Sequence, residues 1–376
     1  MNRMIWCLTL CLSIMACNET SDGEGSSSQI DDNHSQEQAL VVTGEIGVEL
    51  GDSNYVFGVI EDVDIAHDGR IAVLDSQQKK VMVYSPEGNF LGSFGGTGEA
   101  PGEFLNPRSV AWLSDGRIAV SDPFSREVEI FNEDFSHSET VTSFTERAPF
   151  VITATEIGFA GEQGGFNRDE GTVSQRILSW NLETDSIHTL MDVESRFSTD
   201  NLAARFMEPQ AGIAFAGGSI LFAPPVTEEY RVQVYPLDGS EGEPLTFPDY
   251  TPVSRSQQEI DEEMQEFEDR IQAMMASGRG SRFADVEYAP PRDYYAITAL
   301  GVDSEGTVWV RRGWESTPIF DLFLPGETTP SSTISAVTDE EDISSFDFVI
   351  ASGGFAAFER DPEYYPRVLL LELQNN

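Results

Sequence analysis

The chain has 376 residues, 40% of them hydrophobic, and a formal net charge of −43 from 65 acidic and 22 basic side chains. This hydrophobic content is sufficient for a globular core. The acidic excess argues against nucleic acid as a partner, because phosphate binding needs Lys or Arg clustered on one face. Such acidity is typical of salt-adapted surfaces, and it also keeps an extracytoplasmic protein soluble, so the sequence leaves both explanations open.

The first residues predict export. Residues 1–16 combine one basic residue, an apolar stretch and a small residue before Cys17, which is the pattern of a signal peptide too short to span a bilayer. The segment from Ile14 to Cys17 resembles a bacterial lipobox, whose cysteine is acylated and becomes the mature N-terminus, although Met15 is unusual there. The alternative is ordinary signal-peptidase cleavage nearby.

Residues 17–38 follow as the lipidated cysteine and a flexible acidic tether with almost no apolar residues. Cys17 would be the only cysteine of the mature chain, so no internal disulfide is expected. We therefore expect a monomer in the cell envelope, anchored to the outer membrane through lipid alone. The sequence leaves open whether it faces the periplasm or the cell surface.

Residues 39–376 contain a repeat. Residues 63–75 realign without gaps with residues 110–122, 47 positions later, and each unit contains an Asp-Gly pair between alternating apolar residues. The pattern predicts strand, two-residue hairpin turn, strand, polar loop and two further strands. Four strands in a unit of this length form a propeller blade.

Weaker copies follow in chain order, at residues 175–182, 217–235, 304–323 and 346–373. The last copy ends after a third strand, and residues 40–48 precede the first complete repeat as a candidate for the missing fourth. We therefore predict an all-β fold, a six-bladed β-propeller of four-stranded antiparallel blades in which an N-terminal strand closes the last blade. Closure would hide the sheet edges that an open array exposes.

Two segments carry a family resemblance. Residues 95–110 are similar to the inter-blade signature of NHL-repeat proteins, and particularly of bacterial six-bladed propeller lipoproteins. Residues 75–81 resemble the Asp loop of that family, with Lys80 where the family commonly has Arg, whereas Glu127 occupies this place in the next unit. The resemblance implies a recognition scaffold, and it also implies a few hydrolase and lyase branches, so it does not settle function.

An insertion of about residues 254–278, between blades four and five, predicts a short helix. Ser256 and Glu259 form a capping-box pattern, and apolar residues follow at helical spacing from Ile260 to Met274. Alone, such a helix is marginal, so its apolar stripe must rest on the propeller's own rim or on a partner protein. We expect the rim, where the helix could cover the mouth of the central channel.

Loops that lead into each innermost strand, and loops between second and third strands, share one face, which we call the top face. The candidate ligand-binding residues on this face are arginines, because a guanidinium binds a carboxylate through two hydrogen bonds. They are Arg108, Arg126, Arg292, Arg311, Arg312 and Arg360. The alternative for each is an ion pair with a neighbouring acid that serves the fold alone.

Enzyme chemistry has weaker support. The sequence contains no Gly-x-Ser-x-Gly, HExxH, P-loop or paired-cysteine motif. Zinc would need converging imidazoles, but His67 falls in a hairpin turn and His137 and His188 in outer strands or their turns. Calcium needs only carboxylates and amides, so it stays possible while no other cofactor is expected.

The sequence therefore favours an envelope-anchored binding propeller whose top face recognises a protein, peptide or glycan. The alternative is a calcium-dependent, lactonase-like hydrolase or lyase with its site in the central channel.

Overall fold

The computed structural model describes residues 38–375, except residues 143, 145–146, 168–169, 197–211, 277–287, 339–341, 361 and 363. The expected signal peptide, Cys17 and nearly all of the expected tether lie outside the described residues. So does most of the segment of residues 195–209. No helix in the described part of the chain combines the length and hydropathy needed to cross a membrane.

The strands follow one another as four-stranded blades. Blades 1 to 3 contain β2 (Ile60–Ile65), β3 (Ile71–Asp75), β4 (Lys80–Tyr84) and β5 (Phe90–Gly95); β6 (Ser109–Trp112), β7 (Ile118–Asp122), β8 (Glu127–Phe131) and β9 (His137–Val141); and β10 (Val151–Thr155), β11 (Gly158–Asn167), β12 (Thr172–Asn181) and β13 (Ser186–Arg196). Blades 4 to 6 contain β14 (Gly212–Ala216), β15 (Ser219–Ala223), β16 (Arg231–Pro236) and β17 (Leu245–Thr246); β18 (Ile297–Val302), β19 (Val308–Arg312), β20 (Ile319–Phe323) and β21 (Ser332–Val337); and β22 (Asp347–Ala351), β23 (Gly354–Phe358), β24 (Val368–Asn375) and β1 (Gln38–Ile46).

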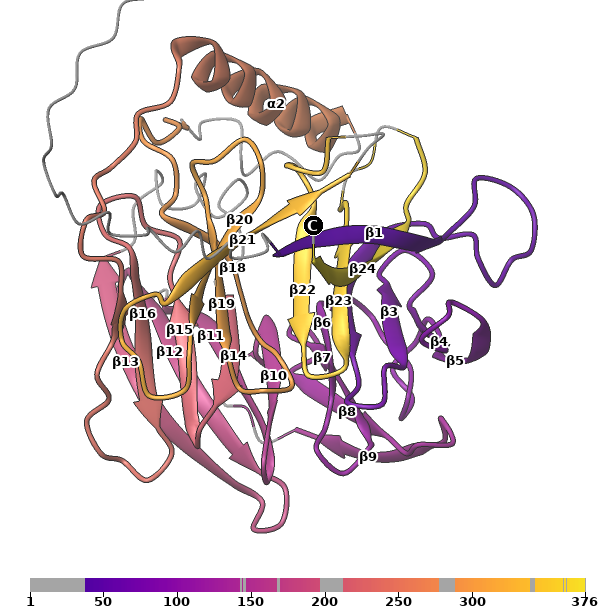
Figure 1. Ribbon diagram of the computed structural model, residues 1–376. Helices are drawn as coiled ribbons and strands as arrows, with labels where there is room; N and C mark the ends of the chain where they lie inside the picture. Colours follow the sequence, from indigo (N-terminus) through magenta and orange to yellow (C-terminus); the bar gives the residue numbers. More distant parts are fainter. Residues whose placement is uncertain are drawn as a thin grey trace, which may run out of the picture. The chain divides into compact units, whose positions relative to one another are not determined.

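The first strands of the blades form a closed ring. Going round, β2, β6, β10, β14, β18 and β22 contact one another in this order, and β22 returns to β2 (Figure 1). The predicted six-bladed propeller is therefore confirmed. Buried apolar side chains fill the space between neighbouring blades, as Phe104, Val110 and Phe131 of blade 2 do against blade 1.

The N-terminal strand closes the last blade, as predicted. β1 pairs antiparallel with β24, from Gln38 opposite Asn375 to Ile46 opposite Val368, with a register shift between Val42 and Gly44. β1 also pairs in parallel with β21 of blade 5, which joins blades 5 and 6 into one eight-stranded sheet. The two ends of the described chain are therefore hydrogen-bonded within the same blade.

The Asp-Gly turns differ from the two-residue hairpin that we predicted. Ala66 N donates to Arg70 O at 2.8 Å and Gly69 N to Ala66 O at 2.8 Å, so the loop contains three residues. Only Gly69 adopts a positive φ, of 86°, while Asp68 accepts a hydrogen bond from Arg70 N at 3.2 Å. Gly116 and Gly306 repeat this geometry, with φ of 85° and 80°. The glycine thus supplies the left-handed residue after a tight turn.

The loop between second and third strands has a structural role in blades 1 and 2. The buried Asp75 carboxylate accepts hydrogen bonds from Gly58 N at 2.6 Å and Gln78 N at 2.8 Å. Asp122, its counterpart 47 positions later, accepts from Leu105 N and Asn106 N, both at 2.8 Å. In each of these two blades the aspartate therefore connects, by hydrogen bonds, the segment that leads into the first strand with the top-face loop between the second and third strands.

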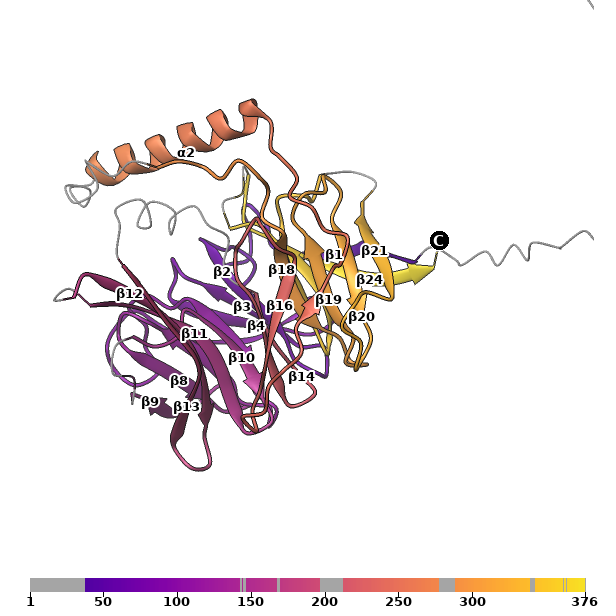
Figure 2. The same cartoon turned by 90° about the vertical axis from the view of Figure 1, so that its left-hand side faces the viewer.

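The predicted helix is α2 (Gln257–Ala276), between β17 and β18. Its capping box is present, since Glu259 N donates to Ser256 Oγ at 3.2 Å and Ser256 N to Glu259 Oε2 at 2.8 Å. Figures 1 and 2 show α2 lying across the top of the ring, outside the blades.

Ring closure predicts a large cost for a small truncation in β1. Leu40 is fully buried among residues of blades 5 and 6, so Leu40→Ala should lower the free energy of unfolding by about 3 kcal/mol in urea denaturation. Leu50→Ala is the matched control, because Leu50 is 86% exposed and its loss should cost less than about 0.5 kcal/mol. Equal effects of the two substitutions would contradict closure by β1.

Candidate functional site

The central channel contains a cavity in the described structure. It has a volume of about 600 Å³, and every blade contributes lining residues from its innermost strand, including Asp62, Trp112, Thr153, Ile213, Thr298 and Phe348. A volume of this size accommodates a small molecule or the end of a polymer chain.

Two aspartates of β2 connect blade 1 to blade 2 within this channel. Asp62 Oδ2 accepts hydrogen bonds from Ser109 Oγ at 2.7 Å and Val110 N at 2.9 Å. Asp64 Oδ2 accepts from Trp112 N at 2.7 Å. These backbone N–H groups lie on the free edge of β6, which no strand covers, so the two carboxylates satisfy the edge of the neighbouring blade.

Burial changes the protonation of both aspartates. They keep partial access to the channel but are surrounded by protein, and this burial raises the pKa of Asp62 to about 6 and the pKa of Asp64 to about 7, with the charge of Asp62 contributing to the latter. Hydrogen bonds from Ser109 and Trp112 act in the opposite direction but do not cancel the effect of burial.

An ionic cluster lies at the top mouth of the channel, where the innermost strands begin. Arg108 Nη1 contacts Glu61 Oε1 at 2.6 Å, and Arg360 Nη1 approaches the same oxygen at 3.5 Å. Arg360 Nε also donates to Asp347 Oδ2 at 2.6 Å. Burial opposes the charge of Arg360, but Asp347, Asp62 and Glu61 outweigh it and raise the pKa of the guanidinium.

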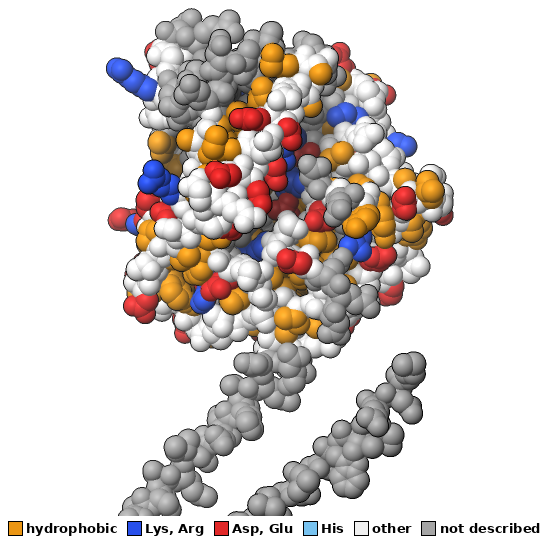
Figure 3. Space-filling view, turned by 90° about the horizontal axis from the view of Figure 1, so that it is seen from above, with side chains coloured by type: hydrophobic (Ala, Val, Ile, Leu, Met, Phe, Trp, Pro, Cys, Tyr) orange, Lys and Arg blue, Asp and Glu red, His pale blue; other side chains and the backbone are white. Residues whose placement is uncertain are grey.

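The cluster brings together two of the predicted arginines, from blades 2 and 6, around a buried glutamate of blade 1. The Arg108 and Arg360 side chains are 36% and 33% exposed, whereas the Glu61 side chain is only 10% exposed. Figure 3 views the top face and shows side chains of both charges gathered in a hollow near its middle.

Arg311 has a different environment from the one that we predicted. It is 8% exposed, and its guanidinium donates to Phe346 O at 2.7 Å and to Ser344 O, while its Cζ atom lies 4.9 Å from the centre of the Phe348 ring. Burial lowers the pKa of Arg311 to about 10. The side chain therefore joins blade 5 to blade 6 and is not presented to solvent.

Arg312 is likewise engaged in the interior. Its guanidinium forms a bidentate pair with the fully buried Asp321, with contacts of 2.8 and 3.0 Å, and this pairing raises the pKa of Arg312. Tyr230 Oη from blade 4 donates to the same carboxylate at 2.8 Å. Arg311 thus joins blade 5 to blade 6, and the Arg312–Asp321 pair, through Tyr230, joins blade 5 to blade 4.

Arg126 and Arg292 lie on the top face but outside the channel-mouth cluster. Both side chains are exposed, and neither forms an ion pair with any residue that the structure describes. Arg126 belongs to the β7–β8 loop and has a φ of 65°, the same left-handed conformation as its counterpart Lys79 in blade 1.

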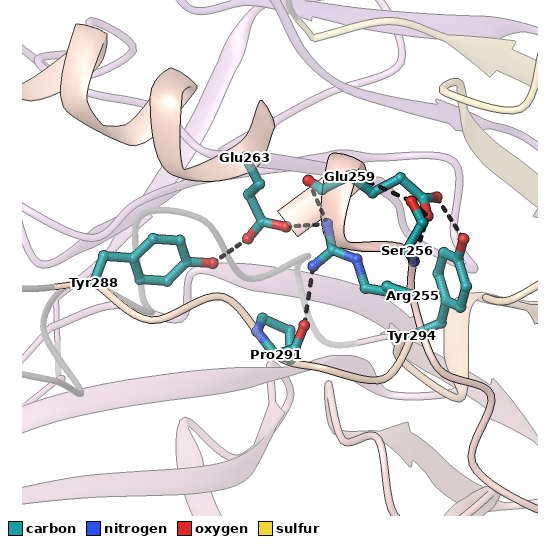
Figure 4. Close-up of polar contacts among 7 residues, drawn as sticks. All are labelled: Arg255, Ser256, Glu259, Glu263, Tyr288, Pro291 and Tyr294. Carbon is teal, nitrogen blue, oxygen red and sulfur yellow. Dashed lines mark hydrogen bonds and ion pairs between the residues drawn. The ribbon is translucent and has the colours of Figure 1, made fainter. Parts of the chain in front are cut away.

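The helix is fastened to the segment that returns to blade 5. Arg255 contacts Glu263 at 2.6 Å, Tyr288 donates to the same carboxylate, and Tyr294 donates to Glu259 (Figure 4). Hydrogen bonds from Ser256 and Tyr294 lower the pKa of Glu259 to about 2.

The predicted apolar stripe of α2 is only partly covered in the described structure. Phe267 is buried, with its ring 4.9 Å from that of Tyr288, Ile260 and Ile271 are half-buried, and Met264 is 40% exposed. The described contacts of the helix are with its own return segment, and its expected contact with the blade rim stays a prediction.

The described residues contain no candidate set of metal ligands. No three His, Cys, Asp or Glu side chains among them gather in a metal-binding arrangement. His67 lies at the bottom end of the channel, His137 pairs with the buried Glu129 at 2.6 Å, and His188 lies on the outer strand β13, as the sequence suggested.

The sequence reasoning missed Glu61, Asp62, Asp64 and Asp347, although the repeat contained a signal. Glu61 and Arg108 are 47 residues apart, and so are Asp62 and Ser109, so each contact joins equivalent positions of adjacent blades. A comparison of charge at equivalent repeat positions would have pointed to both contacts.

Comparisons with known proteins agree with this architecture. A family model described as a six-bladed β-propeller, DUF5128, matches residues 51–140, which span blades 1 and 2. A DUF4221-family protein from Bacteroides vulgatus is 8% identical with a TM-score of 0.51, covering 91% of this chain and 99% of its own. No curated protein sequence matches.

Two further solved structures are similar at lower scores. Virginiamycin B lyase from Staphylococcus aureus is 8% identical with a TM-score of 0.42, covering 90% of this chain and 89% of its own. The WD40 repeats of RRP9 are 12% identical with a TM-score of 0.45, covering 89% and 100%. At these identities the likeness concerns the propeller fold alone, and the NHL-type resemblance stays a prediction.

The raised pKa values predict that stability falls as pH rises. In the folded protein Asp64 keeps its proton up to about pH 7, whereas in the unfolded chain an aspartate releases its proton near pH 4. The free energy of unfolding therefore falls as pH rises from about 4 to about 7. Between pH 5 and pH 8 the free energy of unfolding should fall less in Asp64→Asn than in the native chain, by at least about 1 kcal/mol.

Denaturant titrations at several pH values measure this slope. Asp249→Asn, at an exposed position, is the control with an unchanged slope. An unchanged slope in Asp64→Asn would show that burial does not control this carboxyl group.

Proposed function

We propose that the protein is an envelope-anchored binding propeller that recognises an anionic protein, peptide or glycan on its top face. The observation that supports this proposal is that Arg108 and Arg360 both contact Glu61 at the channel mouth. Glu61 and Asp347 balance the charge of these two guanidinium groups, which nevertheless remain partly exposed beside a cavity, where N–H donors can bind an anionic group of a ligand.

The contacts of Arg108 suggest how a ligand carboxylate is held. A guanidinium has five N–H donors, and Arg108 uses one of them on Glu61 among the described residues. Because Glu61 is buried and fixes the orientation of the guanidinium, the remaining donors are available to a ligand without a large entropy loss. Arg360, held by Asp347, adds a second positive charge beside the same opening.

The calcium-dependent alternative gains no support from the described residues. The carboxylates nearest the channel accept backbone hydrogen bonds, as Asp62 and Asp64 do, or pair with arginine, as Glu61 and Asp347 do. A calcium site would need several of these oxygens to converge on one point, and we therefore propose no step that uses a metal.

We propose a lipid anchor at Cys17 as the means of retention in the envelope. In Cys17→Ser, acylation cannot occur, so the protein should move from the membrane fraction to the soluble fraction in a fractionated cell extract. Labelling with a fatty acid analogue should mark the native chain and not the variant. Retention of Cys17→Ser in the membrane fraction would exclude the proposed anchor.

A capture experiment tests the channel mouth. Immobilised native protein and Arg108→Gln are incubated with an envelope fraction of the source organism, and retained species are quantified by mass spectrometry. Loss of a charged hydrogen bond should reduce the specifically retained ligand at least about tenfold.

Arg117→Gln is the matched control, because Arg117, like Arg108, forms ion pairs, here with Asp115 and Glu139, but lies in the β6–β7 turn on the opposite face. Its retention should equal that of the native protein. Thermal melting of all three proteins checks that folding is intact. Equal retention by native protein and Arg108→Gln would contradict the proposed role of the mouth.

A further inference from the structure

A second candidate interaction surface lies on the top face at the junction of blades 2 and 3, separate from the channel-mouth cluster. Phe124 and Arg126 belong to the β7–β8 loop, Arg147 and Phe150 to the segment that leads into β10, and Leu105 to the segment that leads into β6. We call these five residues the Phe124 patch.

The aromatic residues of the patch are ordered around one arginine. The rings of Phe124 and Phe150 are 6.1 Å apart and nearly perpendicular, at 88°. Arg147 Cζ lies 4.8 Å from the centre of the Phe124 ring and 5.8 Å from that of Phe150. Cation–π contacts of this kind fix the guanidinium over the rings while its edges stay open to a ligand.

The patch is exposed although its backbone is anchored. Phe124 is 52% exposed and Leu105 43% exposed. The Asp122 carboxylate binds Leu105 N, and Ser121 Oγ donates to Pro149 O at 2.5 Å, so the segments on both sides are held by buried groups. A rigid, exposed aromatic side chain loses little entropy on binding and is typical of interaction hot spots.

Folding does not require an aromatic residue at this position. In blade 1 the counterpart of Phe124, 47 positions earlier, is Gln77, which is exposed in the equivalent Asp loop. Both loops place the residue two positions later, Lys79 or Arg126, in the left-handed conformation, with φ of 59° and 65°. The same loop geometry therefore forms with a polar side chain, so the fold of the blade 2 loop does not depend on the exposed ring of Phe124.

The charge of the patch indicates the chemistry of its partner. Arg126 and Arg147 are exposed, and neither forms an ion pair with a described residue, in a chain that has 65 acidic side chains. Two acids of the same blade are committed, since Asp122 accepts backbone N–H groups and Glu129 binds His137, whereas Glu127 is adjacent to Arg126 and partly exposed. Arg147, whose guanidinium lies over the rings of Phe124 and Phe150, is therefore the main cationic group that the patch offers to a partner.

We propose that the Phe124 patch binds an acidic peptide segment of a partner protein, in which an apolar side chain packs on Phe124 and a neighbouring carboxylate binds Arg147 or Arg126. Charge complementarity favours an acidic partner, and the net charge of −43 disfavours nucleic acid. This site is independent of the proposed function of the channel mouth, because it shares no residue with that cluster.

Selection from a random heptapeptide phage library tests the proposal with the full-length protein as target. Native protein should enrich peptides in which Asp or Glu is adjacent to an aromatic or aliphatic residue. The affinity of the most enriched peptide is then measured by fluorescence anisotropy. Phe124→Gln, which copies the blade 1 loop and should fold normally, and Arg147→Gln should each weaken binding at least about tenfold.

Controls separate this site from other surfaces. Leu91→Gln removes a comparably exposed apolar side chain, 49% exposed on the outer strand β5, and should leave the affinity unchanged. Binding that survives Phe124→Gln but is lost in Arg108→Gln would place the peptide at the channel mouth and overturn the proposal. Enrichment of basic peptides, or no enrichment, would also overturn it.

A sedimentation assay with phosphatidylglycerol vesicles addresses the lipid alternative, since Phe and Arg together also suit an anionic membrane surface. The assay uses a Cys17→Ser chain. We expect that Phe124 makes no contribution to its cosedimentation with the vesicles. Cosedimentation that Phe124→Gln abolishes would identify the patch as a membrane contact and contradict a peptide-binding role.

Discussion

The pairing of β1 with β24 is the constraint on which the rest of the structure depends. Each blade packs on two neighbours, so an unclosed ring would expose the apolar faces of its first and last blades and the edge of β24. Closure by β1 removes these edges and holds β22 against β2. Because Arg360 and Asp347 belong to blade 6 and Glu61 to blade 1, the channel-mouth cluster forms only across this closed junction.

Arginine has three distinct roles in this acidic chain, decided by what surrounds each guanidinium. Arg311 and Arg312 satisfy carbonyl groups and a buried carboxylate between blades, where they contribute to the fold. Arg108 and Arg360 are oriented by acids but remain partly exposed at the channel. Arg126 and Arg147 lie beside an exposed ring. The proposed recognition surfaces use the second and third groups, because these guanidinium groups are at least partly exposed to solvent.

The sequence predicted the architecture well because a propeller is encoded locally. The repeat of residues 63–75 at 110–122, the apolar residues of β1 and the Ser256–Glu259 capping box were sufficient for the blades, the closure and the helix. The partners of individual arginines were not predictable in this way. Arg311 contacts the carbonyl groups of residues 344 and 346 only once blades 5 and 6 pack together, and Arg312 reaches Asp321 only through the pairing of β19 with β20. The turn was mispredicted because Asp-Gly also suits a three-residue loop.

Amide hydrogen exchange along β1 tests the account most directly. If β1 is an integral strand of blade 6, its amides from Ala39 to Ile46 should exchange as slowly as those of β24 and should become exposed in the same cooperative unfolding event. The account would be contradicted by rapid exchange in β1 while the amides of β22 to β24 remain protected, because the ring would then be closed without its N-terminal strand.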